Sequence, residues 1–194
     1  MKIEHHHIII PLMHDINESG DLAIVKEDKE YYYLGLIDGL GHGKNANIAA
    51  KIAIEYLDNN FSNSLDELII QLNEKLHGTV GAVIALCCLN KNNKEMIYSG
   101  IGNITVRIIG RKSFKCISRD GIVGYSMPNP KNDNYNLYPG DLLLMYSDGV
   151  KEHFDLLDLP GLQNESAVKI TETLIETYSK NNDDVSMITC KVKR

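Results

Sequence analysis

Two apolar stretches of this sequence end in the same dipeptide, an aspartate followed by a glycine. The first is Tyr31–Gly39, which contains Asp38, and the second is Leu142–Gly149, which contains Asp148. At the end of an apolar strand an aspartate side chain leaves the core, and a following glycine lets the backbone come close to whatever the carboxylate binds. Carboxylates in this position are suited to holding a hard metal cation.

Further aspartates stand where apolar segments begin. Asp21 opens one such segment, and the pair Asp183 and Asp184 opens the last one. Because these residues open or close strands that could share one end of a sheet, Asp21 and Asp183 are predicted to converge with the first two aspartates. Asp-Gly is also an ordinary turn dipeptide, and Asp120-Gly121, which follows polar residues, is interpreted as a turn.

Convergence of these carboxylates would make a cation necessary. Two carboxylates about 4 Å apart repel by roughly 4 kcal/mol at an effective dielectric constant near 20. Several such pairs would destabilise a fold worth only about 5–15 kcal/mol. Oxygen ligands favour Mg²⁺ or Mn²⁺, and the sequence offers no cluster of cysteine and histidine that would favour zinc.

The glycine-rich stretch Asp38–Lys44 resembles a phosphate-binding loop, but its spacing does not fit one. A P-loop needs GxxxxGK[ST], whereas Gly39 and Gly43 are one residue too close and Asn45 replaces Ser or Thr. A dinucleotide-binding loop needs a third glycine where this chain has Lys44. Both interpretations are therefore rejected.

The elements that must position the aspartates follow from periodicity and turn residues. The predicted strands are Ile3–Ile10, Asp21–Val25, Tyr31–Ile37, Val80–Leu89, Glu95–Ser99, Ile104–Ile109, Phe114–Ile117, Leu142–Ser147 and Val185–Val192. The predicted helices are Lys44–Asn60, Leu65–His77 and about Glu165–Tyr178. Strands and helices do not alternate strictly, so the order favours an α+β layered sandwich over a doubly wound sheet. The strand Val80–Leu89 is apolar almost throughout, which is typical of a strand covered on both faces.

Two details of the helices are predicted as well. In the first helix, Ile48, Ile52 and Tyr56 fall on one face, with Ala49, Ala53 and Leu57 beside them. Before the second helix, Ser64 and Glu67 have the spacing of a capping box.

The composition is that of an ordinary globular protein, with 43% hydrophobic and 24% charged residues in 194. The length and the absence of a linker or repeat predict one domain over residues 1–194. The net charge of -6 argues against a nucleic-acid or anionic-membrane partner. The four cysteines form no CxxC pair, and the N-terminus lacks the features of a signal peptide. We therefore expect buried, reduced thiols in a cytoplasmic protein.

Six stretches of the sequence, taken together and in their order along the chain, match the motifs of a known family. They are Ser19–Val25, Leu36–Gly43, Gly81–Leu86, Tyr98–Ile108, Pro139–Val150 and Asn182–Val192. Together they resemble the metal-dependent serine/threonine protein phosphatases of the 2C type (PPM), in their compact bacterial SpoIIE-like branch. The DGLGHG and GIGN segments are most similar to RsbX-type phosphatases, which act on phosphorylated STAS-domain proteins of stressosome and partner-switching pathways.

The resemblance implies a four-layer αββα sandwich, two antiparallel sheets flanked by helices, with a binuclear Mn²⁺ or Mg²⁺ centre between the sheets. It implies that Asp38 bridges both ions and that the Gly39 carbonyl binds one of them. The remaining ligands would be Asp21, Asp148 and Asp183, and Asp184 would be a neighbour. The implied reaction is attack of metal-activated water on the phosphorus of phosphoserine or phosphothreonine.

His42 is the only histidine beside the Asp38 motif. It is either a general acid for the leaving oxygen or a loop histidine, and no arginine is evident to clamp the phosphate. Two other functions stay open: a non-catalytic regulatory binding module with the same fold, and a small-molecule phosphatase.

Overall fold

The computed structural model describes residues 1–13, 15–151 and 154–193. Its strands are β1 (Ile3–Ile10), β2 (Asp21–Glu27), β3 (Tyr31–Gly39), β4 (Ala82–Asn90), β5 (Glu95–Ile101), β6 (Thr105–Ile109), β7 (Phe114–Lys115), β8 (Asp133–Asn136), β9 (Leu142–Tyr146) and β10 (Val185–Val192). Its helices are α1 (Lys44–Asn60), α2 (Leu65–Leu76) and α3 (Ala167–Tyr178), with 3-10 turns η1 (Ile16–Glu18), η2 (Leu156–Asp158) and η3 (Leu162–Asn164).

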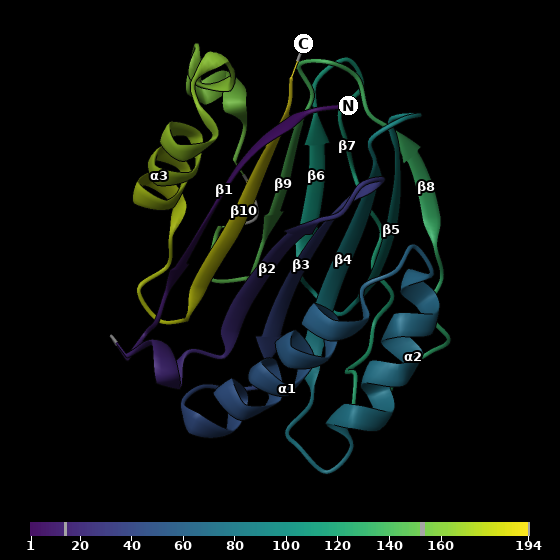
Figure 1. Ribbon diagram of the computed structural model, residues 1–194. Coiled ribbons are helices and arrows are strands. Elements are labelled where there is room, and N and C mark those ends of the chain that lie inside the picture. Colours follow the sequence, from purple (N-terminus) through teal and green to yellow (C-terminus); the bar gives the residue numbers. More distant parts are fainter. Residues whose placement is uncertain (14, 152–153, 194) are drawn as a thin grey trace.

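The strands form two antiparallel sheets that pack face to face. One sheet has the order β2-β3-β4-β5-β8 and is covered by α1 and α2, and the other has the order β1-β10-β9-β6-β7 and is covered by α3 (Figure 1). Three clusters of buried hydrophobic residues fill the three spaces between these four layers. The predicted α+β sandwich with four layers is therefore confirmed.

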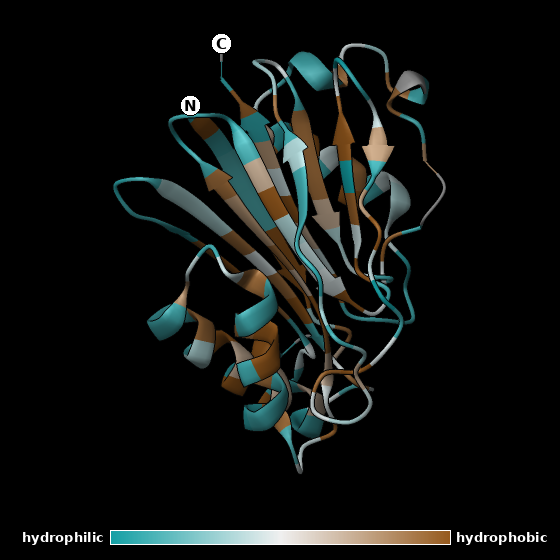
Figure 2. Ribbon diagram, turned by 90° about the vertical axis from the view of Figure 1, so that its right-hand side faces the viewer, coloured by the Kyte–Doolittle hydropathy of each residue, from teal (hydrophilic) through white to brown (hydrophobic). Residues whose placement is uncertain are grey.

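Strand β4 has protein on both faces, as its apolar sequence predicts. Its even-numbered residues from Ala82 to Cys88 belong to the cluster under α1 and α2, and its odd-numbered residues from Val83 to Leu89 belong to the cluster between the sheets. This division follows from the two-residue repeat of a strand. Figure 2 shows the same pattern at larger scale, with hydrophobic residues concentrated in the strands and on the inner sides of the helices.

Helix α1 begins and ends where the sequence predicts, but it buries a different face. Its buried residues are Ala46, Asn47, Ala49, Ala50, Ala53 and Leu57. Ile48, from the predicted stripe, is exposed, while Ile52 and Tyr56 are only partly buried. The alanines that the sequence places beside this stripe are the residues that face the sheet, because their small side chains let the helix axis lie close to β2 and β3.

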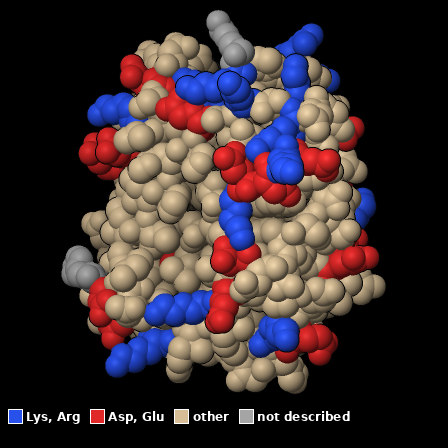
Figure 3. All heavy atoms as spheres, viewed as in Figure 1, with Lys and Arg blue, Asp and Glu red and all other residues tan. Residues whose placement is uncertain are grey.

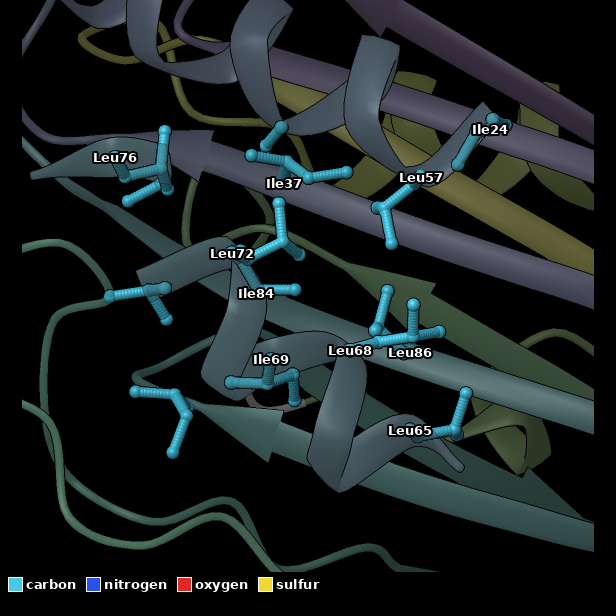
Figure 4. Close-up of a cluster of buried hydrophobic side chains, with 14 of the residues drawn as sticks. Ile24, Ile37, Leu57, Leu65, Leu68, Ile69, Leu72, Leu76, Ile84 and Leu86 are labelled. Carbon is cyan, nitrogen blue, oxygen red and sulfur yellow. The ribbon is translucent and has the colours of Figure 1, made fainter. Parts of the chain in front are cut away.

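Helix α2 packs its apolar face on the sheet, and Figure 4 shows this face beside Ile37, Ile84 and Leu86. The buried residues of the helix are Leu65, Leu68, Ile69, Leu72 and Leu76. Its predicted capping box is wrong, because the Ser64 side chain makes no cap hydrogen bond. Asn132 from a distant loop takes this role: its Oδ1 accepts from the backbone N–H of Asp66 at 3.0 Å, and its Nδ2 donates to the Asp66 carboxylate at 2.7 Å. A local pattern cannot reveal a cap supplied by another segment.

Strand β8 is the one strand of the described chain that the sequence did not predict. Its sequence, DNYN, is polar, and its residues alternate between half-buried and exposed at the edge of a sheet. Tyr135 alone holds it inward by stacking on Phe114, with ring centroids 4.9 Å apart. The predicted strands otherwise occur, with ends that shift by a few residues.

Two predictions about single residue types are confirmed. All four cysteines are buried and free. His5, His6 and His7, which their consecutive spacing in an apolar segment predicts to be part of an ordinary edge strand, lie in β1 at the edge of its sheet. No helix within the described ranges has the length and apolar character that crossing a membrane requires.

Candidate active site

The four predicted aspartates come from both sheets. Asp21 begins β2 and lies directly opposite Asp38 of β3 in the antiparallel register, so the two side chains share one face. Asp148 follows β9 and Asp183 precedes β10, and these two strands are neighbours in the other sheet. The aspartates therefore do not share one end of a single sheet, as the residues alone suggested. They lie at facing ends of the two sheets, near enough for their charges to interact.

Asp184 joins the two sheets at this end through backbone hydrogen bonds. Its Oδ2 accepts from the backbone N–H of Gly20 and its Oδ1 from that of Leu12, both at 2.7 Å. The side chain is buried, and both oxygens are engaged. Asp184 is therefore a structural residue that fixes the loop before Asp21.

Asn47 of α1 holds the same loop from the other side. Its buried amide donates to the backbone oxygens of Ser19 at 2.7 Å and Ile16 at 3.1 Å. This role could not be predicted from the sequence, since an asparagine inside a helix is usually a surface residue. Together Asn47 and Asp184 set the position from which Asp21 enters the site.

The glycines of both Asp-Gly pairs are required by close backbone packing. A Cβ on Gly39 would lie 2.2 Å from the backbone oxygen of Ala46 in α1, and one on Gly149 would lie 1.9 Å from the backbone oxygen of Asp184. Neither glycine has a positive φ. The predicted need for close backbone approach is thus met, but the approaching group is another part of the protein.

Burial and mutual repulsion shift the acidity of the aspartates. Burial raises the pKa of Asp38, and the charges of Asp21, Asp148 and Asp183 raise it further. Burial likewise raises the pKa of Asp21, although the nearby hydroxyls of Ser147 and Ser186 partly offset this.

The same forces act on the fourth aspartate of the set. Burial and the Asp148 charge raise the pKa of Asp183, while the charge of Lys180 opposes that rise. Because each carboxylate influences the others, they form one charged cluster.

A hard divalent cation fits this donor set. The Oδ2 atom of Asp21 is buried and has no hydrogen-bond partner of normal geometry, which is costly for a carboxylate unless a cation or donor compensates it. Within the described residues, no three carboxylate, imidazole or thiolate groups are close enough to form a ready-made site. The residues that would hold a cation here are Asp21, Asp38, Asp148 and Asp183, whose carboxylate oxygens suit a hard divalent ion.

Two residues that the sequence did not single out contact Asp148. The amide of Asn103 donates to Asp148 Oδ2 at 2.9 Å. The Lys180 ammonium donates to the backbone oxygen of Asp148. Asn103 belongs to the GIGN stretch, which was a usable signal, whereas Lys180 is an exposed lysine in a polar loop and gave none.

His42 lies exposed in the loop between β3 and α1. Gly41 and Gly43 flank it with φ values of 82° and 76°, a conformation that glycine adopts without strain. This loop begins two residues after Asp38. Its role as a general acid stays a prediction.

The family to which the chain belongs agrees with this geometry. A family model described as stage II sporulation protein E (SpoIIE) matches residues 28–193. Phosphoserine phosphatase RsbX of Bacillus subtilis (strain 168) is 21% identical over 201 residues, which cover 97% of each chain.

Solved structures show the same fold. A structure from work on the bacterial stressosome as a modular system has a TM-score of 0.90 and 29% identity, over 98% of this chain and 100% of that one. RsbX in complex with magnesium has a TM-score of 0.82 and 19% identity, over 98% and 96%. The PP2C phosphatase domain of SpoIIE from Bacillus subtilis has a TM-score of 0.78 and 19% identity, over 99% and 62%. The chain thus belongs to the SpoIIE family of 2C-type serine phosphatases.

Proposed function

We propose that this chain is a single Mn²⁺- or Mg²⁺-dependent phosphatase domain that removes phosphate from phosphoserine or phosphothreonine in a protein. The observation that carries the proposal is the cluster of carboxylates from two sheets, with a buried Asp21 oxygen that lacks a partner. Such a cluster is unfavourable without cations and is suited to two of them.

The residues of the chain have distinct tasks in this proposal. Asp38, at the centre of the mutual repulsion, would contact both ions, and the Gly39 carbonyl would contact one. The remaining ligands would be Asp21, Asp148 and Asp183. When bound, the two cations lower the pKa of water and neutralise charge on the phosphate oxygens. Asn103 holds the Asp148 carboxylate in a fixed orientation.

In the net reaction, a bond forms between water oxygen and phosphorus, and the phosphorus–oxygen bond to the serine or threonine breaks. The leaving oxygen needs a proton, and His42 is the residue of this chain that we assign to supply it. Its exposed loop position allows the imidazole to reach a substrate that approaches from solvent.

The substrate that we propose is a phosphorylated STAS-domain regulator of stressosome or partner-switching signalling in the cytoplasm. Similarity to RsbX over 97% of both chains supports it, as does similarity to a structure described in stressosome work. The acidic net charge of -6 is consistent with a protein partner rather than nucleic acid or an anionic membrane. Figure 3 shows acidic and basic side chains interspersed on one face, without a broad basic surface.

The proposal is tested by phosphate release from a phosphorylated STAS-domain protein with added Mn²⁺ or Mg²⁺. Wild-type protein is expected to be active, and Asp38→Asn and Asp148→Asn are expected to be inactive. Undiminished activity in both variants contradicts the proposed site. Turnover of free phosphometabolites alone would instead indicate a small-molecule phosphatase, and metal-independent partner binding without turnover would indicate a regulatory module.

A further inference from the structure

A cleft of about 560 Å³ opens directly beside the aspartate cluster. Its lining includes Ser147 and Asp148 after β9, the residues at the start of β6 and the segment that follows β7. Its volume lies within the range of about 300–1,000 Å³ that is usual for binding pockets. The cleft therefore gives a substrate side chain access to the site from the Asp148 side.

Two cationic side chains line this cleft, Lys115 and Lys180. Three arginines are described: the Arg107 guanidinium donates to the Phe154 carbonyl at 2.9 Å, Arg111 stacks on Tyr138, and Arg119 lies between the lining residues Ser118 and Asp120. None of the three lines the cleft. The cationic residues of the cleft lining are therefore both lysines.

Lys180 is held at this mouth by two contacts. Its backbone N–H donates to the Gly149 oxygen at 2.7 Å, and its ammonium donates to the Asp148 oxygen. The positive charge also acts on the Asp183 carboxylate. An ammonium has three N–H donors, so after the bond to Asp148 two remain for another acceptor.

A phosphate group needs such a cation here. The aspartates carry negative charge, and a phosphate dianion that enters the site approaches that charge directly. Charge-assisted hydrogen bonds from an ammonium to phosphate are roughly twice as strong as neutral ones. Lys180 lines the cleft and is bonded to the backbone oxygen of Asp148, so its ammonium lies where it could make this contact.

We propose that Lys180 binds the phosphate group of the substrate at the mouth of this cleft, an inference that rests on the proposed phosphatase function. The role is that of the phosphate clamp for which the sequence offered no arginine. It makes Lys180 a substrate-binding residue that contacts the phosphate and not the metal ions.

The test uses the full chain with saturating Mg²⁺ and compares Lys180→Met, Lys180→Arg and the control Lys169→Met. Lys169 is an exposed residue of α3 outside the cleft. Three quantities are measured: the affinity for inorganic phosphate by calorimetry, KM and kcat for a phosphoserine peptide, and the rise in melting temperature that Mg²⁺ causes.

For Lys180→Met we expect about tenfold weaker phosphate binding and about tenfold higher KM, which corresponds to about 1.4 kcal/mol. The rise in melting temperature with Mg²⁺ should not change. Lys180→Arg should recover phosphate affinity to within about threefold, because the charge and donors are kept, and Lys169→Met should match wild type.

Unchanged phosphate affinity in Lys180→Met overturns the inference, as does a wild-type protein that binds no inorganic phosphate. A loss of the Mg²⁺-dependent melting shift in Lys180→Met also overturns it, because the lysine would then support the metal site. If wild type binds phosphate through Lys180 but hydrolyses no phosphoprotein, the inference stands and the proposed function fails.

Discussion

Asp141 and Asp21 are both buried aspartates at the ends of the sandwich, yet their surroundings are opposite. Asp141 precedes β9 at the far end from the cluster, and its two oxygens accept from the backbone N–H groups of Arg111 at 3.0 Å and Tyr138 at 2.9 Å. Asp21 leaves Oδ2 without a partner.

The comparison separates two uses of one residue type. A buried carboxylate whose oxygens are both hydrogen-bonded stabilises a turn, and removing it exposes unpaired donors. A buried carboxylate that keeps one oxygen unpaired and lies among other carboxylates is destabilising unless a cation compensates its charge. Asp184, with both oxygens engaged, belongs to the first kind although it lies beside the second.

The largest expected effect is on activity, and it is tested by comparing Asp21→Asn with Asp141→Asn. Loss of a ligand charge at the site should lower kcat/KM for a phosphoserine peptide by about 1,000-fold, or about 4 kcal/mol. Asp141→Asn lies at the opposite end of β9, so its activity per folded molecule should stay within about twofold. Similar losses in both variants would show that the two ends do not differ as described.

For the free energy of unfolding we expect the larger loss at Asp141, whereas for activity we expect it at Asp21. Asp141→Ala removes both acceptors of a buried turn, so we expect the free energy of unfolding to fall by about 3 kcal/mol. For a chain of this length that corresponds to a melting temperature lower by about 6–12 °C. The exposed Asp158 offers a matched control, because Asp158→Ala should change stability by less than about 0.5 kcal/mol.

Cations should stabilise only the end that contains Asp21. Mn²⁺ at about 100 times its dissociation constant should raise the free energy of unfolding by about 2.7 kcal/mol, measured as an increase in melting temperature. Asp38→Ala should reduce that increase, and Asp141→Asn should leave it unchanged. A melting curve indifferent to Mn²⁺ in wild-type protein would count against the carboxylate cluster as a metal site.

The stability of the metal-free protein should depend on pH because of the carboxylates at the Asp21 end. The pKa values of Asp38 and Asp21 are raised in the folded state, chiefly by burial, so the folded protein holds protons that the unfolded chain has released. Stability in EDTA should therefore fall as pH rises from about 4 toward the raised values. The slope is at most about 1.4 kcal/mol per pH unit for each retained proton, and Mg²⁺ should flatten it. Urea unfolding at several pH values measures both effects.

The smallest effect expected concerns Asn103, which orients Asp148. Removing such a partner of a metal ligand commonly costs 10–100-fold in activity, and the exposed position of Asn103 reduces this to about fivefold for Asn103→Ala. The measurement is kcat/KM with saturating Mg²⁺. An unchanged value would mean that Asp148 is held without the Asn103 amide.

Local patterns predicted much of the architecture. Alternation and helical spacing placed β1, α1 and β10 at the ends that the structure shows, and the continuous apolar run identified β4 as a strand covered on both faces. The polar edge strand β8 was not predicted, because an edge needs few apolar residues.

The candidate site was predictable by residue type but not by arrangement. Aspartates beside apolar strands indicated oxygen ligands, and the register that pairs Asp21 with Asp38 agrees with their convergence. The resemblance placed the metal centre between the sheets, whereas the spacing of the residues suggested one sheet end. The position of a strand along the chain does not determine which of the two sheets the strand joins.

The sequence by itself determined most of the strands and helices and the residue type, aspartate, from which a hard divalent cation is predicted. Only the tertiary structure decided which aspartates are satisfied by hydrogen bonds and which are not, as Asp184 and Asp21 show. It also decided that Asn132 caps α2 and that Lys180 lies beside Asp148. The physical reason is that these partners come from segments far apart in the chain, and their contacts exist only once the two sheets have packed.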